Sequence, residues 1–180
     1  MRRLLLSCLV LLISLSAPAQ RVWRIMPAGD SITAGGDTYR VYREPFWEKL
    51  TAAGYLVEYT GSRKSESRLG SLAHEGHGGK NVEFLASVIG DAFRKSPADI
   101  VLLHAGHNHF DHEKPIPGIL AATESIVRTC REINPRVTVL VAQVIPAGKL
   151  PKYSYMPELH REPPALAARL VGVGKAGLLR

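Results

Sequence analysis

Apolar segments alternate with amphipathic helical segments along most of this chain, and that alternation restricts the fold more than any other feature. The candidate strands cover residues 22–26, 56–60, 99–105 and 137–144, and candidate helices cover 45–53, 82–94, about 119–133 and 155–170. The run over 99–105 is nearly continuous, as expected of a strand buried on both faces. The pattern predicts an α/β fold, a three-layer sandwich with a central parallel sheet and helices on both faces.

The N-terminus has the composition of a secretory signal. Arg2 and Arg3 precede an apolar run over residues 4–15, and Ala17-Pro18-Ala19 supplies the small residues of a cleavage site. A membrane anchor is the alternative, but a spanning helix needs about 20 apolar residues. We therefore expect residues 1–19 to be a signal peptide, residues 20–180 to be one domain, and the product to be secreted or periplasmic, with no membrane association after cleavage.

Composition excludes several classes of protein. The chain is 46% hydrophobic and 22% charged, which argues against intrinsic disorder. Its net charge of +7 comes from scattered residues rather than from one dense basic run, so we expect no nucleic-acid partner. After removal of the signal only Cys130 remains, which excludes a disulfide framework. Composition leaves the oligomeric state undetermined.

The segment after the first strand carries the clearest chemistry. Ser31 follows Gly29 and Asp30 directly beyond a buried run, where a turn can expose its hydroxyl and aim backbone amides at a developing oxyanion. The same residues are also typical of a helix cap, since Asp and Ser side chains accept bonds from the first backbone amides. The residue types by themselves leave both interpretations open.

Three blocks carry a family resemblance. The first block, residues 25–33, reads Ile-Met-Pro-Ala-Gly-Asp-Ser-Ile-Thr, the second, 74–79, reads His-Glu-Gly-His-Gly-Gly, and the third, 106–109, reads Gly-His-Asn-His. In this order they resemble the blocks of GDSL/SGNH hydrolases, and the first two are most similar to the carbohydrate acetylesterase branch, which includes acetylxylan esterases. The resemblance implies a flavodoxin-like SGNH hydrolase fold and a serine esterase that removes acyl groups, acetyl foremost, from an acylated carbohydrate.

The resemblance also implies roles for individual residues. Ser31 corresponds to the nucleophile, and the amides of Ser31 and Gly79 with the Asn108 side chain correspond to the oxyanion hole. Asp30, His107 and His109 are assigned supporting positions, and His109 stands where the family usually has Asp. Because the three blocks must meet at one sheet edge, we expect the first strand to lie between the second and the third.

The end of the chain departs from the family pattern. Members carry an Asp-x-x-His block that supplies the catalytic histidine, but residues 171–180 include neither Asp nor His. Pro163 and Pro164 interrupt the last helical pattern. We expect a C-terminally incomplete domain, truncated or frame-shifted after about residue 162. A catalytically defective or sugar-binding remnant of such an esterase is the alternative, as is a substitute base such as His160.

Histidines gather in the middle of the chain. His104, His107, His109 and His112, with Asp111, suggest a metal site, because imidazole and carboxylate are common zinc ligands. Their spacing matches no established metal motif. We therefore expect loop histidines that line the pocket, with no metal and no cofactor, and place a metal-dependent hydrolase third among the functions.

Overall fold

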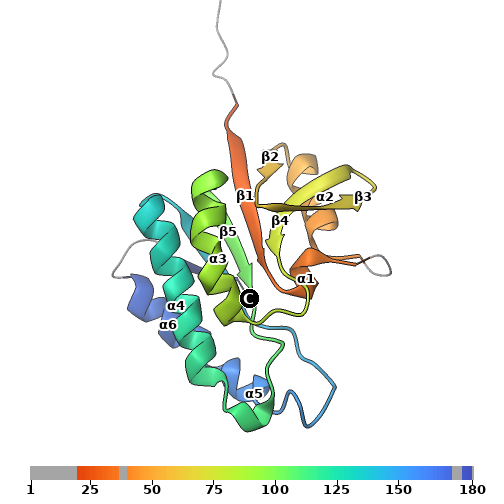
Figure 1. Cartoon of the computed structure of the whole chain (residues 1–180). Helices are drawn as coiled ribbons and strands as arrows, with labels where there is room; N and C mark the ends of the chain where they lie inside the picture. The colour runs from red at the N-terminus through yellow and green to blue at the C-terminus, as the bar shows by residue number, and fades with distance from the viewer. Residues whose placement is uncertain (1–19, 37–39, 172–175, 180) are drawn as a thin grey trace, which may run out of the picture.

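Strand β1 (Val22–Gly29) is the centre of the sheet, and the three sequence blocks lie at or next to its carboxyl end. A computed structural model describes residues 20–36, 40–171 and 176–179, so the expected signal peptide lies outside the described residues. The described strands form one sheet in the order β3-β4-β1-β5-β6-β7, with β2 also paired to β1 (Figure 1). The other strands are β2 (Leu56–Tyr59), β3 (Arg63–Ser67), β4 (Gly70–Gly76), β5 (Ile100–His104), β6 (Thr138–Ala142) and β7 (Ala176–Leu179).

The predicted strand order is confirmed. Strand β1 pairs in parallel with β2 on one side and with β5 on the other, and β5 pairs in parallel with β6. One edge of β1 serves two strands in turn, since β2 pairs with residues 22–25 and β4 with residues 28–29. Pro27 is paired with Leu102 on the β5 edge but falls between the β2 and β4 ladders on the other edge, where a missing N–H interrupts neither ladder. For that reason β1 runs past the proline at which we expected the strand to end.

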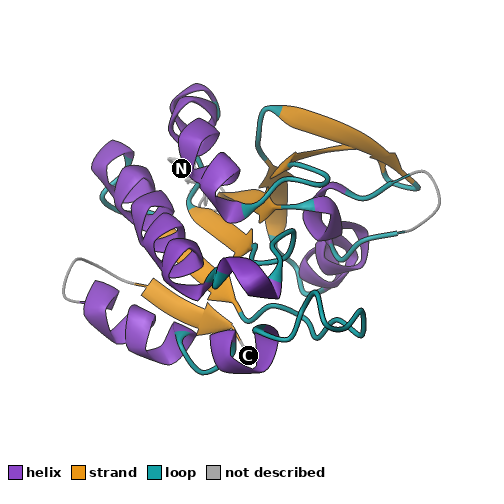
Figure 2. Cartoon of the chain, turned by 60° about the horizontal axis from the view of Figure 1, so that its bottom comes forward, coloured by secondary structure: helices purple, strands orange, loops and turns teal. Residues whose placement is uncertain are grey.

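Alternation along the strands creates a core on each face of the sheet. On one face Met26 and Val101 pack with α3 (Val82–Lys95) and α4 (Ile116–Ile133). On the other face Ile25 and Leu102 pack with residues of α2 (Arg43–Ala52). Adjacent strand residues thus point to opposite layers, which gives the expected three-layer sandwich (Figure 2).

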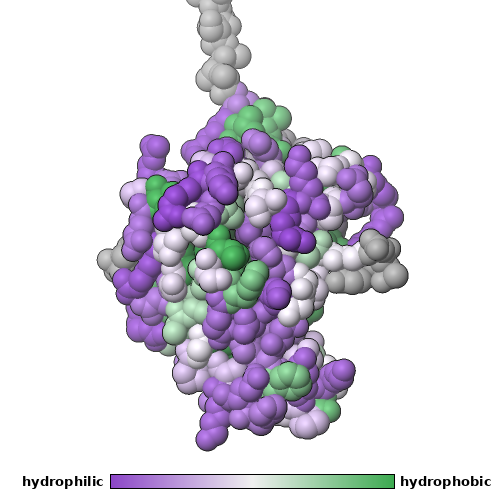
Figure 3. All heavy atoms as spheres, viewed as in Figure 1, coloured by the Kyte–Doolittle hydropathy of each residue, from purple (hydrophilic) through white to green (hydrophobic). Residues whose placement is uncertain are grey.

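Helix α3 shows how the sequence produces these layers. Leu85, Ile89 and Phe93 recur at helical spacing and are fully buried, and each such side chain contributes about 1.5–3 kcal/mol on leaving water. Asn81 caps the helix by accepting a bond from the Phe84 amide at 3.0 Å. The surface seen from this side is mostly hydrophilic (Figure 3).

Three segments differ from the sequence-based expectation. The helical pattern over residues 155–170 forms two helices, α5 (Met156–Leu159) and α6 (Pro163–Val171), because Pro163 begins a helix instead of only breaking one. The hairpin of β3 and β4 is antiparallel and was not predicted, since its strands are polar and exposed along much of their length. Strand β7 pairs in parallel with β6 in a stretch to which we assigned no element. Among the described residues no helix is both long enough and apolar enough to cross a membrane.

His74 on β4 couples this fold to pH. The residue is 2% exposed, and its Nδ1 atom accepts a bond from the Gly76 amide at 2.9 Å. Burial, with smaller contributions from Arg43 and Arg63, lowers the pKa of His74 to about 4. An unfolded histidine has a pKa of about 6.5, so the neutral ring keeps its full contribution to stability above that pH and loses it as pH falls toward 4.

We predict that acid destabilises the protein through His74. Between pH 7 and pH 4.5 this residue alone should remove about 2 kcal/mol from the free energy of unfolding, which urea titrations at both values would measure. His74→Asn retains an acceptor for the Gly76 amide and should reduce the pH-dependent loss by about that amount. The exposed His112 provides the control, because His112→Gln should leave the loss unchanged. Equal losses in the His74 variant and the native chain would contradict the assignment.

Candidate active site

The backbone passes from β1 into α1 (Ser31–Ala34) through a contact that only glycine allows. A Cβ atom on Gly29 would lie 2.1 Å from the His104 carbonyl oxygen and 2.5 Å from Thr33 Oγ1. Asp30 follows and caps the helix, since its Oδ1 atom accepts a bond from the Ile32 amide at 2.9 Å. Ser31 is therefore held at the first position of α1, at the carboxyl end of the central strand.

The second block lies directly against the first. The His77 amide donates to the Gly29 carbonyl at 2.8 Å, and a Cβ atom on Gly76 would lie 2.5 Å from the Ala34 amide nitrogen. Gly79 has a φ of +74°, a left-handed conformation that favours glycine. The turn that carries the Gly79 amide is thus fixed beside the start of α1.

The third block reaches the second through Asn108. This residue also has a positive φ, +66°, and its Nδ2 atom donates to the Lys80 carbonyl at 2.9 Å. A side-chain amide carries two N–H groups, so one bond to Lys80 leaves a second donor for another acceptor. The three blocks therefore meet at the carboxyl edge of the sheet, as expected. The catalytic roles of Ser31, Gly79 and Asn108 stay predictions.

A cluster of buried polar side chains lies next to Ser31 and consists of Asp30, His104 and His107. His107 Nδ1 is 3.6 Å from Asp30 Oδ2, and the two imidazole rings have centroids 5.8 Å apart. Burial lowers the pKa of His104, an effect that the charge of Asp30 partly offsets. The sequence did not predict that these three residues lie together, because Asp30 is far from the two histidines along the chain.

The histidine cluster considered from the sequence separates into different environments. His109 Nε2 contacts Glu83 Oε2 at 2.8 Å and its Nδ1 contacts the His107 carbonyl at 3.1 Å, which ties the third block to α3. His112 lies in the short helix η1 (Asp111–Glu113) against the ring of Phe110. A site made of His104, His107, His109, His112 and Asp111 therefore does not form, and His104 and His107 join Asp30 instead.

Two further histidines have defined partners. His77 Nε2 lies 2.7 Å from Glu75 Oε1, and the other oxygen of this buried carboxylate accepts a bond from the Ser62 amide at 2.8 Å. His160 directs Nε2 to the Val144 carbonyl. That contact ties the alternative base His160 to the loop after β6.

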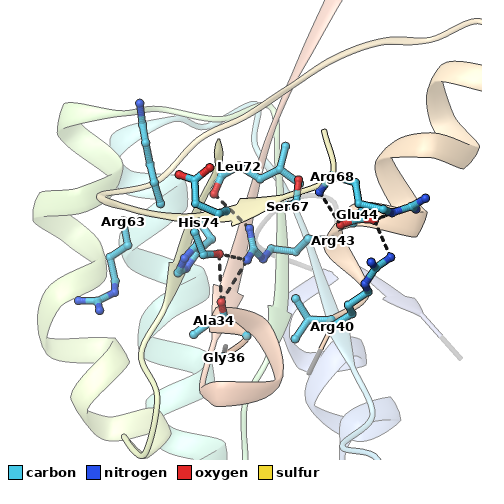
Figure 4. A pocket seen from close by; sticks show the side chains of 15 residues that line it. Ala34, Gly36, Arg40, Arg43, Glu44, Arg63, Ser67, Arg68, Leu72 and His74 are labelled. Atoms are coloured by element: carbon cyan, nitrogen blue, oxygen red, sulfur yellow. Dashed lines mark hydrogen bonds and ion pairs between the residues drawn. The ribbon is translucent and has the colours of Figure 1, made fainter. Parts of the chain in front are cut away.

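A polar cavity of about 940 Å³ opens beside the far end of α1 (Figure 4). Arg43 lies in its wall and donates to the Thr33 carbonyl at 2.8 Å and to the Leu72 carbonyl at 3.1 Å. Its other charged lining residues are Arg40, Glu44, Arg63, Lys64, Glu66 and Arg68. A second, mostly apolar cavity of about 610 Å³ extends from Ile32 over Leu102 and Leu140.

Comparison with known proteins places this arrangement in a family. Residues 28–176 match the GDSL-like Lipase/Acylhydrolase family. A family 3 carbohydrate esterase from Clostridium thermocellum has 27% sequence identity and a TM-score of 0.72, with 88% of this chain and 77% of that chain covered.

Two other solved structures share the fold. A carbohydrate esterase family 3 protein from Talaromyces cellulolyticus has 23% identity and a TM-score of 0.73 over 87% of this chain and 78% of its own. A mutant acetyl esterase with acetate ion has 22% identity and a TM-score of 0.73 over the same shares. Comparison with curated protein sequences finds no match. With three blocks converging at one sheet edge and the family match covering most of the sequence, the chain belongs to the GDSL-like lipase/acylhydrolase family, whose SGNH members are carboxylic-ester hydrolases.

Proposed function

We propose that this chain is a serine esterase that removes acyl groups, acetyl foremost, from a carbohydrate. The observation that carries the proposal is the position of Ser31, at the end of the central strand where contacts join the first block to the second and the second to the third. The family assignment supports ester hydrolysis, and the carbohydrate esterases among the structural neighbours support a sugar ester as substrate.

The reaction proceeds through a covalent acyl-enzyme. Ser31 Oγ attacks the ester carbonyl, a base takes its proton, and the carbonyl oxygen becomes an oxyanion. The amides of Ser31 and Gly79 and the side chain of Asn108 donate to that oxygen. The sugar hydroxyl leaves with a proton, and water then releases the acyl group from Ser31 as a carboxylic acid.

Supporting residues hold these donors in place. Asp30 caps α1 through the Ile32 amide, which fixes the turn that presents Ser31. His109 links the third block to Glu83, because one ring nitrogen contacts the Glu83 carboxylate and the other the His107 carbonyl. The polar cavity beside α1 is large enough for a sugar residue, and its arginines can donate to hydroxyl groups.

We also propose that residues 1–19 direct the protein out of the cytoplasm, to the periplasm or the medium. The basis is the order of residues in that segment, in which two arginines precede an apolar run and a small-residue site. In a bacterial host the exported product should begin at Gln20 by N-terminal sequencing. Ala19→Arg should block cleavage, because the peptidase requires a small residue there. Retention of residues 1–19 in the exported native chain would contradict this.

We predict that any hydrolysis of an aryl acetate depends on Ser31 and Asn108. Ser31→Ala should abolish the Ser31-dependent rate, and in a chain with a working base Asn108→Ala should lower kcat by about 10²–10³, the usual effect of losing one oxyanion donor. His112→Gln, an exposed change in the same loop region, should have no effect. Activity that survives Ser31→Ala but disappears with a chelator would instead favour a metal-dependent hydrolase.

The supply of a base sets the expected rate. The family resemblance places the catalytic histidine in an Asp-x-x-His block, and residues 171–180 include neither residue type. We predict that the 180-residue chain hydrolyses an aryl acetate very slowly and that appending such a segment from a relative raises the rate by orders of magnitude. Ser31→Ala should abolish that gain. Rapid Ser31-dependent turnover without the segment would show that another base serves.

A further inference from the structure

Three buried side chains that carry unpartnered polar atoms lie together at the start of α1. Asp30, His104 and His107 are 2%, 8% and 7% exposed, and one ligand atom from each lies within 4.8 Å of the others. Within the described part of the chain, Asp30 Oδ2, His104 Nδ1 and His107 Nδ1 have no hydrogen-bond partner. One such atom typically costs about 1–3 kcal/mol, so three at one point call for a common partner.

The backbone fixes the opposite side of each group. Asp30 Oδ1 accepts a bond from the Ile32 amide at 2.9 Å, and His107 Nε2 contacts the Ile145 carbonyl at 3.1 Å. His104 Nε2 lies 3.4 Å from the Ile145 amide. Each side chain is therefore anchored at one atom, and its other polar side-chain atom has no hydrogen-bond partner.

The contact between His107 and Asp30 calls for a shared partner. A carbonyl oxygen only accepts, so the contact with Ile145 assigns the proton of a neutral His107 ring to Nε2. The lone pair of Nδ1 then faces the carboxylate of Asp30 at 3.6 Å, which is repulsive. A shared partner between the two atoms removes the repulsion: a bridging water that donates to both, or a metal ion that both coordinate.

We propose that Asp30, His104 and His107 bind one divalent transition-metal ion, with Zn²⁺ as the best match. Two imidazoles and one carboxylate suit Zn²⁺, whereas Ca²⁺ and Mg²⁺ prefer oxygen ligands throughout. The bond from His107 Nε2 to a backbone carbonyl is the outer contact that metal-bound histidines commonly make. Three protein ligands leave a further coordination position for water or substrate.

The distances require only a local adjustment. Bonds of about 2.0–2.2 Å in a tetrahedral site separate ligand atoms by about 3.4 Å. The Asp30–His107 distance of 3.6 Å already fits, and the longest separation, no more than 4.8 Å, must shorten. His104 can supply that movement, because its 3.4 Å contact with the Ile145 amide is long for a hydrogen bond and little is lost when it opens.

Bound metal would join three parts of the sheet edge. Asp30 continues from β1, His104 ends β5, and both histidines contact Ile145 in the loop after β6. The ion would therefore stabilise the turn that presents Ser31. This proposal goes beyond ester hydrolysis and does not depend on it, so its test measures binding.

The experiment titrates the full chain, without a histidine tag, with Zn²⁺ by calorimetry and with Co²⁺ by visible absorption. We expect one equivalent to bind, the Co²⁺ spectrum of a four-coordinate site to appear, and Zn²⁺ to raise Tm. Asp30→Asn retains the cap on Ile32 but loses the charge, and His107→Gln removes a ligand. Each should weaken binding at least about 100-fold. His112→Gln changes an exposed histidine in the same way and should bind like the native chain.

Binding to the native chain can also be followed without any variant. On addition of Zn²⁺, the ring-nitrogen NMR signals of His104 and His107 should shift while those of His112 stay in place. Absence of one-equivalent binding by the native chain would overturn the proposal and leave a bridging water as the shared partner. Equal affinity in the His107→Gln and His112→Gln variants, or shifts confined to other histidines, would also overturn it.

Discussion

The end of β1 is the constraint on which the rest of this structure depends. Gly29 passes so close to the His104 carbonyl that no side chain fits at this position. The carbonyl of Gly29 itself accepts a hydrogen bond from the His77 amide. One residue thus joins the first block to the end of β5 and to the second block. A larger residue at this position would push β1 away from β5, and the loops that follow both strands would lose their common edge.

The site is built from independent anchors rather than from one rigid loop. Asp30 is held by the Ile32 amide, Asn108 by the Lys80 carbonyl and His107 by the Ile145 carbonyl. Because each anchor is a backbone group next to a strand or helix, the sheet sets the geometry of the loops. The polar site can therefore lie at the carboxyl edge of the sheet while the core stays apolar on both faces of the sheet.

Sequence reasoning succeeded where the physics is local. Continuous apolar runs identified β1, β2, β5 and β6, and helical spacing identified α3, because both signals come from residues that are close in the chain. The β3–β4 hairpin was missed because its strands are polar and partly exposed over much of their length, so they lack the apolar runs of the other strands. The resemblance supplied the roles of Gly79 and Asn108, and it favoured a nucleophile at Ser31, where the residue types by themselves also allowed a helix cap. The cap interpretation was also correct for Asp30.

The cluster of Asp30 with His104 and His107 shows why part of the site could not be predicted from the sequence alone. A loop histidine and a strand histidine look alike in sequence, and only strand pairing brings them beside a carboxylate from another block. The aligned ends of β1 and β5, with Gly29 opposite His104 in register, place Asp30 against both rings. Buried polar groups are normally satisfied, so an unsatisfied group at such a junction points to a missing partner instead of to poor packing. The close contact between Gly29 and His104 therefore has two effects. It excludes a side chain at Gly29, and it brings the cluster of buried polar side chains together next to Ser31.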